Sequence, residues 1–270
     1  MPDMIRVTSD LLHRVRSTAP LVHNITNFVV MNSSANTLLA VGAAPVMAHC
    51  IDEVEEMVQL AGALVLNIGT IEPAWLAAML RAGQAANQKG IPVVLDPVGA
   101  GATRLRTAAV ERILAEVEVA VLRGNASEIF SLGRDEIRTR GVDSSLGLGA
   151  EVVAAARALA LGQGCVVAIS GERDLVTDGS RVFRIANGQP LMTRVTGMGC
   201  GLSALTGAFC AVADGELLAA TAAAFGLYGL CGDLAIEVSD RPGSFAVAFL
   251  DALFSVGREE IGRRLLIAEE

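Results

Sequence analysis

Short apolar runs alternate with segments of helical composition along this chain, and this alternation limits the possible folds more than any other feature. Four runs that end in Gly, Asn or Asp-Pro occupy residues 63–68, 91–95, 119–122 and 165–169. Such runs are typical of strands buried on both faces of a parallel sheet. Between them lie three segments of helical composition, 73–88, 105–116 and 145–161. The pattern predicts an α/β fold, with helices on both faces of a mostly parallel central sheet.

The regions before and after this alternation have patterns of their own. Thr8 and Ser9 are typical capping residues and predict a helix through Ser17. Two further helices are expected at 27–41 and 54–60, the second opened by Asp52. Beyond Ser170 the chain changes to antiparallel strands over 174–177 and 181–186, with tight turns at Asp178-Gly179 and Asn187-Gly188. From Gly201 onward the pattern is almost wholly helical.

No sequence feature divides the chain. It has no Pro/Ser-rich linker, no block of like charges and no repeat of 20 to 50 residues. Its 270 residues, 52% of them hydrophobic, are enough for a large core. We therefore expect residues 1–270 to form a single domain.

Composition excludes several classes of partner. Aromatic residues make up only 4% of the chain and the net charge is −8, so neither base stacking nor a basic stripe is available for nucleic acid. Segment 217–232 carries no charge, but its Ala and Gly content favours a buried helix over a membrane span. The start of the chain has no apolar signal region and its cysteines form no CxxC pair. We expect a cytoplasmic protein without a nucleic-acid or membrane partner.

Polar and glycine-rich sequence follows each of the four apolar runs. In an open α/β sheet, ligands bind beyond the carboxyl ends of the strands. These ends carry two carboxylates (Asp96 and Glu128), Asn125 and Arg123, which is a suitable set for a magnesium nucleotide. The alternative interpretation is structural: Asp96 belongs to a strand-end turn and Glu128 is an acid in the first turn of a helix.

The segment from Val195 to Gly201 places three alternating glycines directly before a helix expected over 202–213. Glycines let successive N–H groups point at one spot at a helix N-terminus, where negative charge is also favoured. An anion-binding nest is therefore expected, with a glycine-rich turn that binds nothing as the alternative. Lys89 is the only lysine and no GxxxxGK[ST] occurs, which excludes a Walker-type site.

The same segment carries a specific resemblance. Val-Thr-Gly-Met-Gly-Cys at 195–200 resembles the anion hole of ribokinase-like kinases, whose usual form is Gly-x-Gly-Asp, and a Cys in place of the Asp resembles the hydroxyethylthiazole kinase family. Other blocks similar to that family occur in its order: Val-His-Asn-Ile-Thr-Asn at 22–27, Ala-Pro-Val-Met at 44–47, Leu-Asn-Ile-Gly-Thr at 66–70, Asp-Pro-Val-Gly-Ala-Gly at 96–101 and Asn-Ala-Ser-Glu at 125–128. The resemblance spans residues from about 20 to 235.

The resemblance implies a ribokinase-like three-layer α/β/α fold. It also implies phosphorylation of the hydroxyl of 4-methyl-5-(2-hydroxyethyl)thiazole by ATP with Mg²⁺, in a homotrimer with active sites between subunits. The site residues that it implies are Arg123, Ser170 and Asn125 for ATP, Asp96 and Glu128 for the metal, Met47, Gly197, Asn24 and Thr26 for the thiazole, and Gly197, Gly199 and Cys200 for catalysis.

Cys200 occupies the position at which the wider superfamily has an Asp base. At a helix N-terminus the pKa of a thiol is expected to fall below its usual value near ~8.5, so Cys200 is a candidate base. Phosphoryl transfer depends more on positioning and charge stabilisation, so Cys200 is equally a candidate for positioning only. The other cysteines, Cys50, Cys165, Cys210 and Cys231, are expected in the core.

Three alternatives to the thiazole kinase remain on sequence grounds. They are an ADP/ATP-dependent NAD(P)HX dehydratase, a kinase for another small alcohol such as a pyrimidine or pyridoxal, and a nucleotide-binding relative without catalysis. His13, His23 and His49 are scattered and are interpreted as structural. Residues 135–149, rich in Gly and charge, are expected to form a surface loop near the nucleotide.

Overall fold

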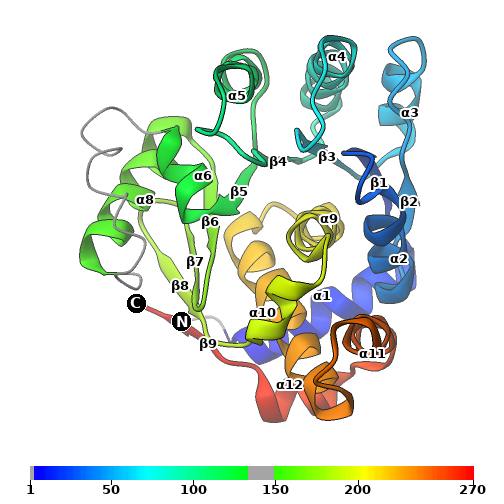
Figure 1. The fold of residues 1–270 in the computed structure, drawn as a ribbon, viewed down its shortest axis with the longest axis vertical. Helices are drawn as coiled ribbons and strands as arrows, with labels where there is room; N and C mark the ends of the chain where they lie inside the picture. The colour runs from blue at the N-terminus through cyan, green and yellow to red at the C-terminus, as the bar shows by residue number, and fades with distance from the viewer. Residues whose placement is uncertain (1–2, 133–148) are drawn as a thin grey trace.

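A nine-stranded sheet runs through the molecule, as Figure 1 shows for the computed structural model, which describes residues 3–132 and 149–270. Its strand order is β2-β1-β3-β4-β5-β6-β7-β8-β9. The strands are β1 (Leu21–Ile25), β2 (Ala44–Val46), β3 (Ala63–Asn67), β4 (Val93–Asp96), β5 (Val121–Asn125), β6 (Val166–Ser170), β7 (Asp174–Thr177), β8 (Val182–Ile185) and β9 (Ile267–Glu269). Neighbours from β2 to β6 pair in parallel, and those from β6 to β9 pair antiparallel.

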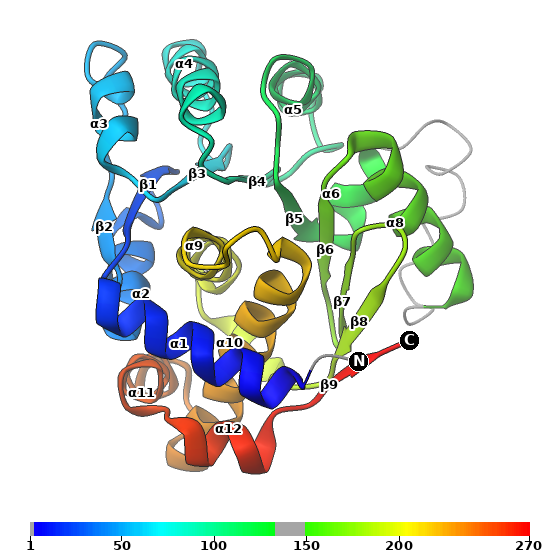
Figure 2. The ribbon, with the colours of Figure 1, turned by 180° about the vertical axis from the view of Figure 1, so that it is seen from behind.

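Helices cover both faces of this sheet (Figures 1 and 2). On one face lie α3 (Val54–Leu60), α4 (Pro73–Lys89), α5 (Arg104–Glu116), α6 (Ala126–Ser131) and α8 (Ala150–Gln163). On the other lie α1 (Met4–Thr18), α2 (Met31–Val41), α9 (Met198–Ala211), α10 (Leu217–Val238), α11 (Pro242–Ser255) and α12 (Arg258–Arg264). The predicted three-layer, mostly parallel α/β/α fold is confirmed.

The core lies in two layers, one on each side of the sheet. Strand β3 shows the reason, because its side chains alternate between the two sides. Leu64 and Leu66 pack into the layer beneath α3, α4 and α5, whereas Val65 packs into the layer that contains α9 and α10. All three side chains are at most 2% exposed. Burial on both faces is what the unbroken apolar runs predicted.

Two expected helix starts in the N-terminal region are wrong. Helix α1 begins at Met4, where Asp3 caps it by accepting from the backbone N–H groups of Ile5 and Arg6, so Thr8 and Ser9 lie inside the helix and are buried. Because Asp3 satisfies free N–H groups at the start of this longer helix, no cap is needed at Thr8 or Ser9. Helix α2 begins at Met31 rather than residue 27.

Helix α3 occupies the expected residues, but Asp52 does not cap it. Its N-cap is Glu53, which makes no capping hydrogen bond through its side chain. Strands β1 and β2 were not predicted from the sequence. His23 and Asn24 interrupt the apolar run of β1, and β2 is only three residues long with Pro45 at its centre.

The antiparallel end of the sheet differs from the expectation at one turn. Asp178-Gly179 does join β7 to β8: Gly179 has a φ of +95°, and Asp178 accepts from the N–H groups of Ser180 and Arg181. Asn187-Gly188 does not form a second hairpin. The free edge of β8 is instead taken by β9, from the other end of the chain, and residues after Gly188 enter the 3-10 helix η1 (Pro190–Arg194).

Helix α10 matches the buried helix expected at 217–232. It is long and apolar enough to cross a membrane, but 83% of its most apolar window is buried against the rest of the protein. Residues 135–148 of the predicted loop, and with them the first residues of the helix predicted at 145–161, lie outside the described residues. Gly149 is the N-cap of α8, which begins at Ala150.

Candidate active site

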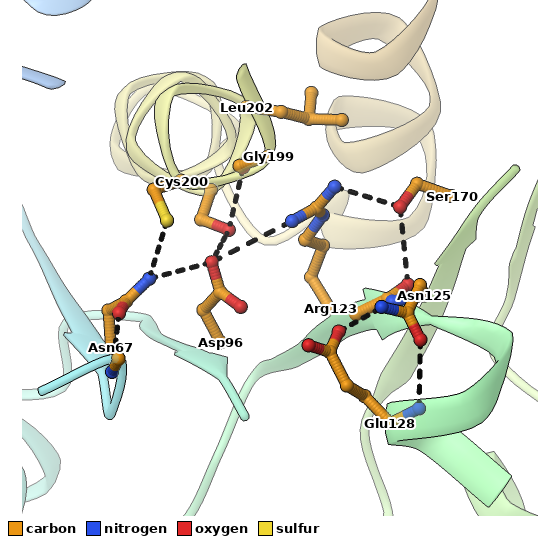
Figure 3. Close-up of polar contacts among 12 residues, drawn as sticks. Asn67, Asp96, Arg123, Asn125, Glu128, Ser170, Gly199, Cys200 and Leu202 are labelled. Carbon is orange, nitrogen blue, oxygen red and sulfur yellow. Dashed lines mark hydrogen bonds and ion pairs between the residues drawn. The ribbon is translucent and has the colours of Figure 1, made fainter. Parts of the chain in front are cut away.

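Four neighbouring strands end in a polar side chain at the same edge of the sheet. These terminal residues are Asn67 of β3, Asp96 of β4, Asn125 of β5 and Ser170 of β6. The parallel register places Asn67 beside Asp96, and Asn125 beside Ser170. The N-terminus of α9 lies over this edge (Figure 3). The prediction that these strand ends form one rim is therefore confirmed in geometry.

Asp96 is the centre of a buried network. Its Oδ2 accepts hydrogen bonds from Asn67 Nδ2 at 2.8 Å and Ser203 Oγ at 2.7 Å, and lies 3.7 Å from Arg123 Nη1. Its Oδ1 is buried and has no hydrogen-bond partner among the residues that the structure describes. Burial raises the pKa of Asp96 to about 6, although Arg123 opposes the rise. Oδ1 is therefore the oxygen of Asp96 that this network leaves without a hydrogen bond.

Arg123 joins the two halves of the rim. The side chain is only 7% exposed, and Nη2 donates to Ser170 Oγ at 2.9 Å while Nη1 faces Asp96. Its Nε is buried without a partner within residues 3–132 and 149–270. A Cβ added at Gly199 would lie 3.0 Å from Nη1, so the glycine lets the guanidinium approach the first turn of α9. Figure 3 shows Arg123 between Asp96 and Ser170, below α9.

Helix α9 begins at Met198, four residues earlier than expected, so the alternating glycines are its first turn rather than a loop before it. The N-cap is Gly197, whose φ of +90° is left-handed, and no side chain caps the helix. A Cβ at Gly197 would also lie 2.6 Å from Ser33 Oγ. The first N–H groups of a helix have no intrahelical partner. Those of Met198, Gly199 and Cys200 thus give this end of α9 a partial positive charge. Met198 and Gly199 also line an open groove.

Cys200 lies against two asparagines. Its Sγ accepts from Asn67 Nδ2 at 3.2 Å and from Asn27 Nδ2 at 3.7 Å. Burial, together with the negative charge of Asp96, raises the pKa of Cys200 to about 11. The expected fall in pKa is therefore wrong: loss of water and a nearby carboxylate outweigh the helix N-terminus. Cys165, Cys210 and Cys231 are buried as expected, whereas Cys50 is exposed.

Glu128 and Asn125 form a capping box at the start of α6. Asn125 Oδ1 accepts from the N–H of Glu128, and Glu128 Oε2 accepts from the N–H of Asn125, both at 2.9 Å. Glu128 Oε1 accepts from the N–H of Gly99, which fixes the loop after β4. These contacts are those expected if Glu128 is an acid in the first turn of a helix, which was the structural alternative to a metal ligand. Among residues 3–132 and 149–270, no group of three His, Cys, Asp or Glu side chains could hold a metal.

Three of the residues expected to bind the thiazole, Asn24, Thr26 and Met47, lie in or directly after β1 and β2. Asn24 is buried, and its Nδ2 donates to the carbonyl of Val22 in its own strand. Thr26 is also buried, and Met47 follows the last residue of β2. It is Asn27 that reaches Cys200, and it also donates to Asn67 Oδ1 at 2.8 Å.

Three residues of the network were not selected from sequence: Asn27, Asn67 and Ser203. Asn27 and Asn67 both lie within blocks that resemble the family, so their type and place were available signals. Ser203 lies three residues after Cys200, which is helical spacing on one side of α9. Extending the predicted helix back to residue 198 would have placed it near Asp96.

A groove of about 900 Å³ opens beside Arg123. One wall is formed by the ends of β5 and β6 and the loop to β7, and the opposite wall by the segment from residue 186 to the first turn of α9. Phe225, Tyr228 and Gly229 of α10 form its floor. The volume suits a nucleotide, and Arg123, Ser170 and Gly199 lie where the groove meets the polar rim.

The chain that carries this polar strand-end rim and uncapped helix start was also compared with known proteins, and the comparison gives a family. A profile of the hydroxyethylthiazole kinase family matches residues 12–259. The chain belongs to this family. Hydroxyethylthiazole kinase from Desulfotalea psychrophila is 49% identical over 269 residues, which cover 100% of this chain and 98% of that protein.

Solved structures agree with the family assignment. The hydroxyethylthiazole kinase protein from Pyrococcus horikoshii has a TM-score of 0.90 and 44% identity, covering 98% of this chain and 99% of that chain. A ribokinase-like superfamily protein from Enterococcus faecalis has a TM-score of 0.62 at 15% identity, covering 93% of this chain and 95% of that one. The second likeness concerns the fold alone and supports the ribokinase-like class.

His23 is a buried histidine from which we expect a pH dependence of stability in this member of the hydroxyethylthiazole kinase family. The side chain is 0% exposed and Nε2 lies 2.7 Å from the carbonyl oxygen of Ala48, whereas Nδ1 has no partner in the described part of the chain. Burial lowers the pKa of His23 below its usual 6.5. Below pH 6.5 the unfolded chain thus binds a proton that the native site resists, so stability is lost as pH falls.

We expect His23→Gln to remove this dependence, because glutamine keeps a donor for Ala48 but does not titrate. Between pH 7 and pH 5 the wild type should lose up to about 1.4 kcal/mol per pH unit more unfolding free energy than the variant. Urea unfolding at pH 5, 6 and 7 measures the difference. Parallel stability curves for the two proteins would show that His23 is not held neutral.

Proposed function

We propose that this chain transfers the terminal phosphoryl group of ATP to the hydroxyl of 4-methyl-5-(2-hydroxyethyl)thiazole. The observation that carries the proposal is the meeting of three features at one sheet edge, in a member of the hydroxyethylthiazole kinase family. These are the uncapped start of α9, the buried pair Arg123 and Asp96, and the adjoining groove. Each supplies one requirement of phosphoryl transfer: anion binding, charge control and nucleotide space.

ATP is proposed to lie in the groove with its phosphates toward Arg123. The guanidinium has a buried, unpartnered Nε and already contacts Ser170, so a phosphate arriving here meets a preoriented donor set. Asn125 lines the same end of the groove. Asp174, at the start of β7, is a further carboxyl on this wall, and burial raises its pKa to about 7.

Asp96 and Glu128 are the residues proposed to hold Mg²⁺. Asp96 fits, because its Oδ1 is buried without a partner, and magnesium takes one or two carboxylates with waters and substrate phosphates completing the shell. Glu128 has both oxygens engaged by backbone N–H groups, which suits contact through water. The ion would neutralise charge on the phosphates of ATP.

The alcohol is proposed to bind on the Cys200 side of the rim, with Met47, Gly197, Asn24 and Thr26 contributing to the thiazole pocket. Its oxygen forms a bond to the γ-phosphorus as the bond to the β–γ bridging oxygen breaks and ADP leaves, and the hydroxyl proton is released to water. The N–H groups of Met198, Gly199 and Cys200 stabilise the charge on the transferring group. Gly197 and Gly199 keep that end of α9 open.

A coupled assay for ADP release tests the proposed activity. The enzyme receives ATP and Mg²⁺ with the thiazole alcohol, a pyrimidine alcohol or pyridoxal in parallel. We expect release with the thiazole, and ³¹P NMR should show a phosphate monoester of that alcohol. No release with the thiazole, or faster turnover of another alcohol, would contradict the proposal. Conversion of a hydrated nicotinamide nucleotide would favour the dehydratase instead.

Cys200 is proposed to position the alcohol rather than to accept its proton, because burial raises the pKa of its thiol to about 11. We expect Cys200→Ala to lower kcat by less than about tenfold, since general-base catalysis is typically worth about 10²-fold or more. The pH profile of kcat should keep its shape. A loss above a hundredfold in Cys200→Ala, restored by Cys200→Asp, would identify Cys200 as the base.

We further propose a cytoplasmic homotrimer with active sites at subunit interfaces. Supporting this, Phe28 and Val29 are 63% and 65% exposed, directly after Asn27, which contacts Cys200. Exposed apolar residues beside a site are typical of a subunit contact. All five cysteines, which lie in the described part of the chain, are free, as in a reducing compartment. Light scattering of the wild type and Phe28→Asp tests the assembly.

A further inference from the structure

The wall of the groove between β8 and α9 contains no strand, so something else must hold it in place. It begins at Ala186, passes through the short helix η1 and ends at Gly197. Strand β8 pairs with β7 and β9, and its ladder ends at Ile185. Loop segments without their own secondary structure are mobile unless tied by side chains or packing.

Asp233 on α10 makes that tie. Its Oδ1 accepts from the backbone N–H of Gly188 at 3.1 Å and from Gln189 Nε2 at 2.8 Å. Its Oδ2 accepts from Asn187 Nδ2 at 2.8 Å. Three consecutive residues at the start of the wall are therefore bonded to one carboxylate on the helix that forms the floor of the groove.

Asn187 extends the tie to the end of the chain. The side chain is 5% exposed, and Nδ2 donates a second time, to the carbonyl of Arg264, at 2.8 Å. Its Oδ1 accepts from the N–H of Leu266 at 2.6 Å. Every polar atom of this amide is used, so it fixes the position of α12 and β9 relative to the groove wall.

Close backbone packing accompanies these hydrogen bonds. A Cβ at Gly229 would lie 2.5 Å from the carbonyl oxygen of Asn187, and one at Gly232 would lie 2.6 Å from Met192 Sδ. Gly229, Gly232 and Asp233 are spaced so that they share one side of α10. The wall thus lies directly on the helix backbone, and Asp233 is the charged group on that surface.

We infer that Asp233 and Asn187 are positioning residues for the nucleotide: they hold the 186–197 wall against α10, so that the groove is formed before ATP enters. The inference rests on the proposed function, because it assigns the groove to ATP. Neither residue touches the Asp96 network, so binding of the thiazole alcohol should not depend on them.

The test measures binding of the non-hydrolysable analogue β,γ-methylene-ATP by calorimetry, and KM for each substrate by the coupled assay. In Asp233→Ala we expect Kd for the analogue and KM for ATP to rise about tenfold or more, as lost hydrogen bonds to a charged group predict. The kcat at saturating ATP and the KM for the thiazole alcohol should stay within about threefold of wild type, since the wall can still close around bound ATP.

Two control variants separate positioning from simple loss of stability. Glu237→Gln removes the ion pair with Arg264 one turn along the same helix, and Val110→Ala opens a core cavity in α5 on the other face of the sheet. Both should retain the wild-type Kd, although Val110→Ala lowers Tm. The exchanged pair N187D/D233N re-forms the side-chain hydrogen bond with roles reversed and should recover part of the affinity lost in each single variant.

Unchanged Kd in Asp233→Ala and in Asn187→Ala, together with a lowered Tm, would overturn the inference and leave the cluster a purely stabilising contact. Should Asp233→Ala fail to fold, Asp233→Asn, which keeps one acceptor oxygen, is measured in its place and should show an intermediate Kd. Failure of the wild type to bind the analogue would instead overturn the nucleotide assignment of the groove, and the inference with it.

Discussion

Asp96→Asn is expected to lower kcat by about 10²- to 10³-fold, the size typical for loss of one preorganised charge in an active site. The substitution removes the negative charge and one ligand oxygen, while an amide oxygen can still accept from Asn67 or Ser203. The measurement is kcat at saturating ATP and thiazole alcohol. Asp251→Asn, at an exposed position on α11, is the matched control and should keep full activity.

The same variant should not be destabilised at neutral pH. Burial raises the pKa of Asp96 to about 6, above the 3.8 of an exposed group. The native state therefore holds a proton more tightly than the unfolded chain, and stability from this group is lost as pH rises through about 6. Asp96→Asn lacks that loss, so its Tm relative to wild type should be higher at pH 8 than at pH 5. The opposite trend would show that Arg123 overcompensates for burial.

Arg123→Ala is expected to lower kcat/KM by about 10³-fold or more, because an arginine on the transferring phosphoryl group is worth that much in related chemistry. Arg123→Lys should recover little, since an ammonium cannot contact Ser170 and a phosphate with the same planar fork. Steady-state kinetics with ATP as the varied substrate measures both. Activity in Arg123→Ala within tenfold of wild type would remove Arg123 from the phosphate site.

Arg123→Ala should also destabilise the protein by about 3 kcal/mol, because it leaves the carboxylate of Asp96 buried without its cation. The double variant D96N/R123A should be more stable than R123A alone, since neither charge is then buried. Urea unfolding at pH 8 measures both. Arg157→Ala is the control: this arginine of α8 binds the carbonyls of Gly179 and Ser180, far from the rim, so its loss should affect stability and not turnover.

The strand ends show where sequence reasoning was sufficient. Asn67, Asp96, Asn125 and Ser170 each end a strand of the parallel part of the sheet. Parallel strands bring their carboxyl ends to one edge, so finding the strands also located the rim. The two strands that were not found, β1 and β2, are the ones in which polar residues or a proline interrupt the apolar pattern.

Sequence reasoning was not sufficient to predict the contacts of individual residues. Glu128 is a candidate metal ligand by type and place, but its sequence context could not show that both its oxygens accept from backbone N–H groups, one of them 29 residues away in sequence. Asn187-Gly188 has the composition of a hairpin turn, but β9 already occupies the edge of β8. In both cases the competing partner lies far along the chain, and local pattern carries no information about it.

The sequence by itself determined the layered α/β architecture, the edge at which the site lies and the family, because strand periodicity, strand ends and motif order are local properties of the chain. Only the tertiary structure decided the charge states of the buried site residues and the hydrogen bonds between distant segments. Burial among distant residues keeps Cys200 a thiol and raises the pKa of Asp96, and the Asn187–Asp233 tie joins segments 46 residues apart. Desolvation and long-range hydrogen bonds depend on what surrounds a group in space, which is a property of the folded chain.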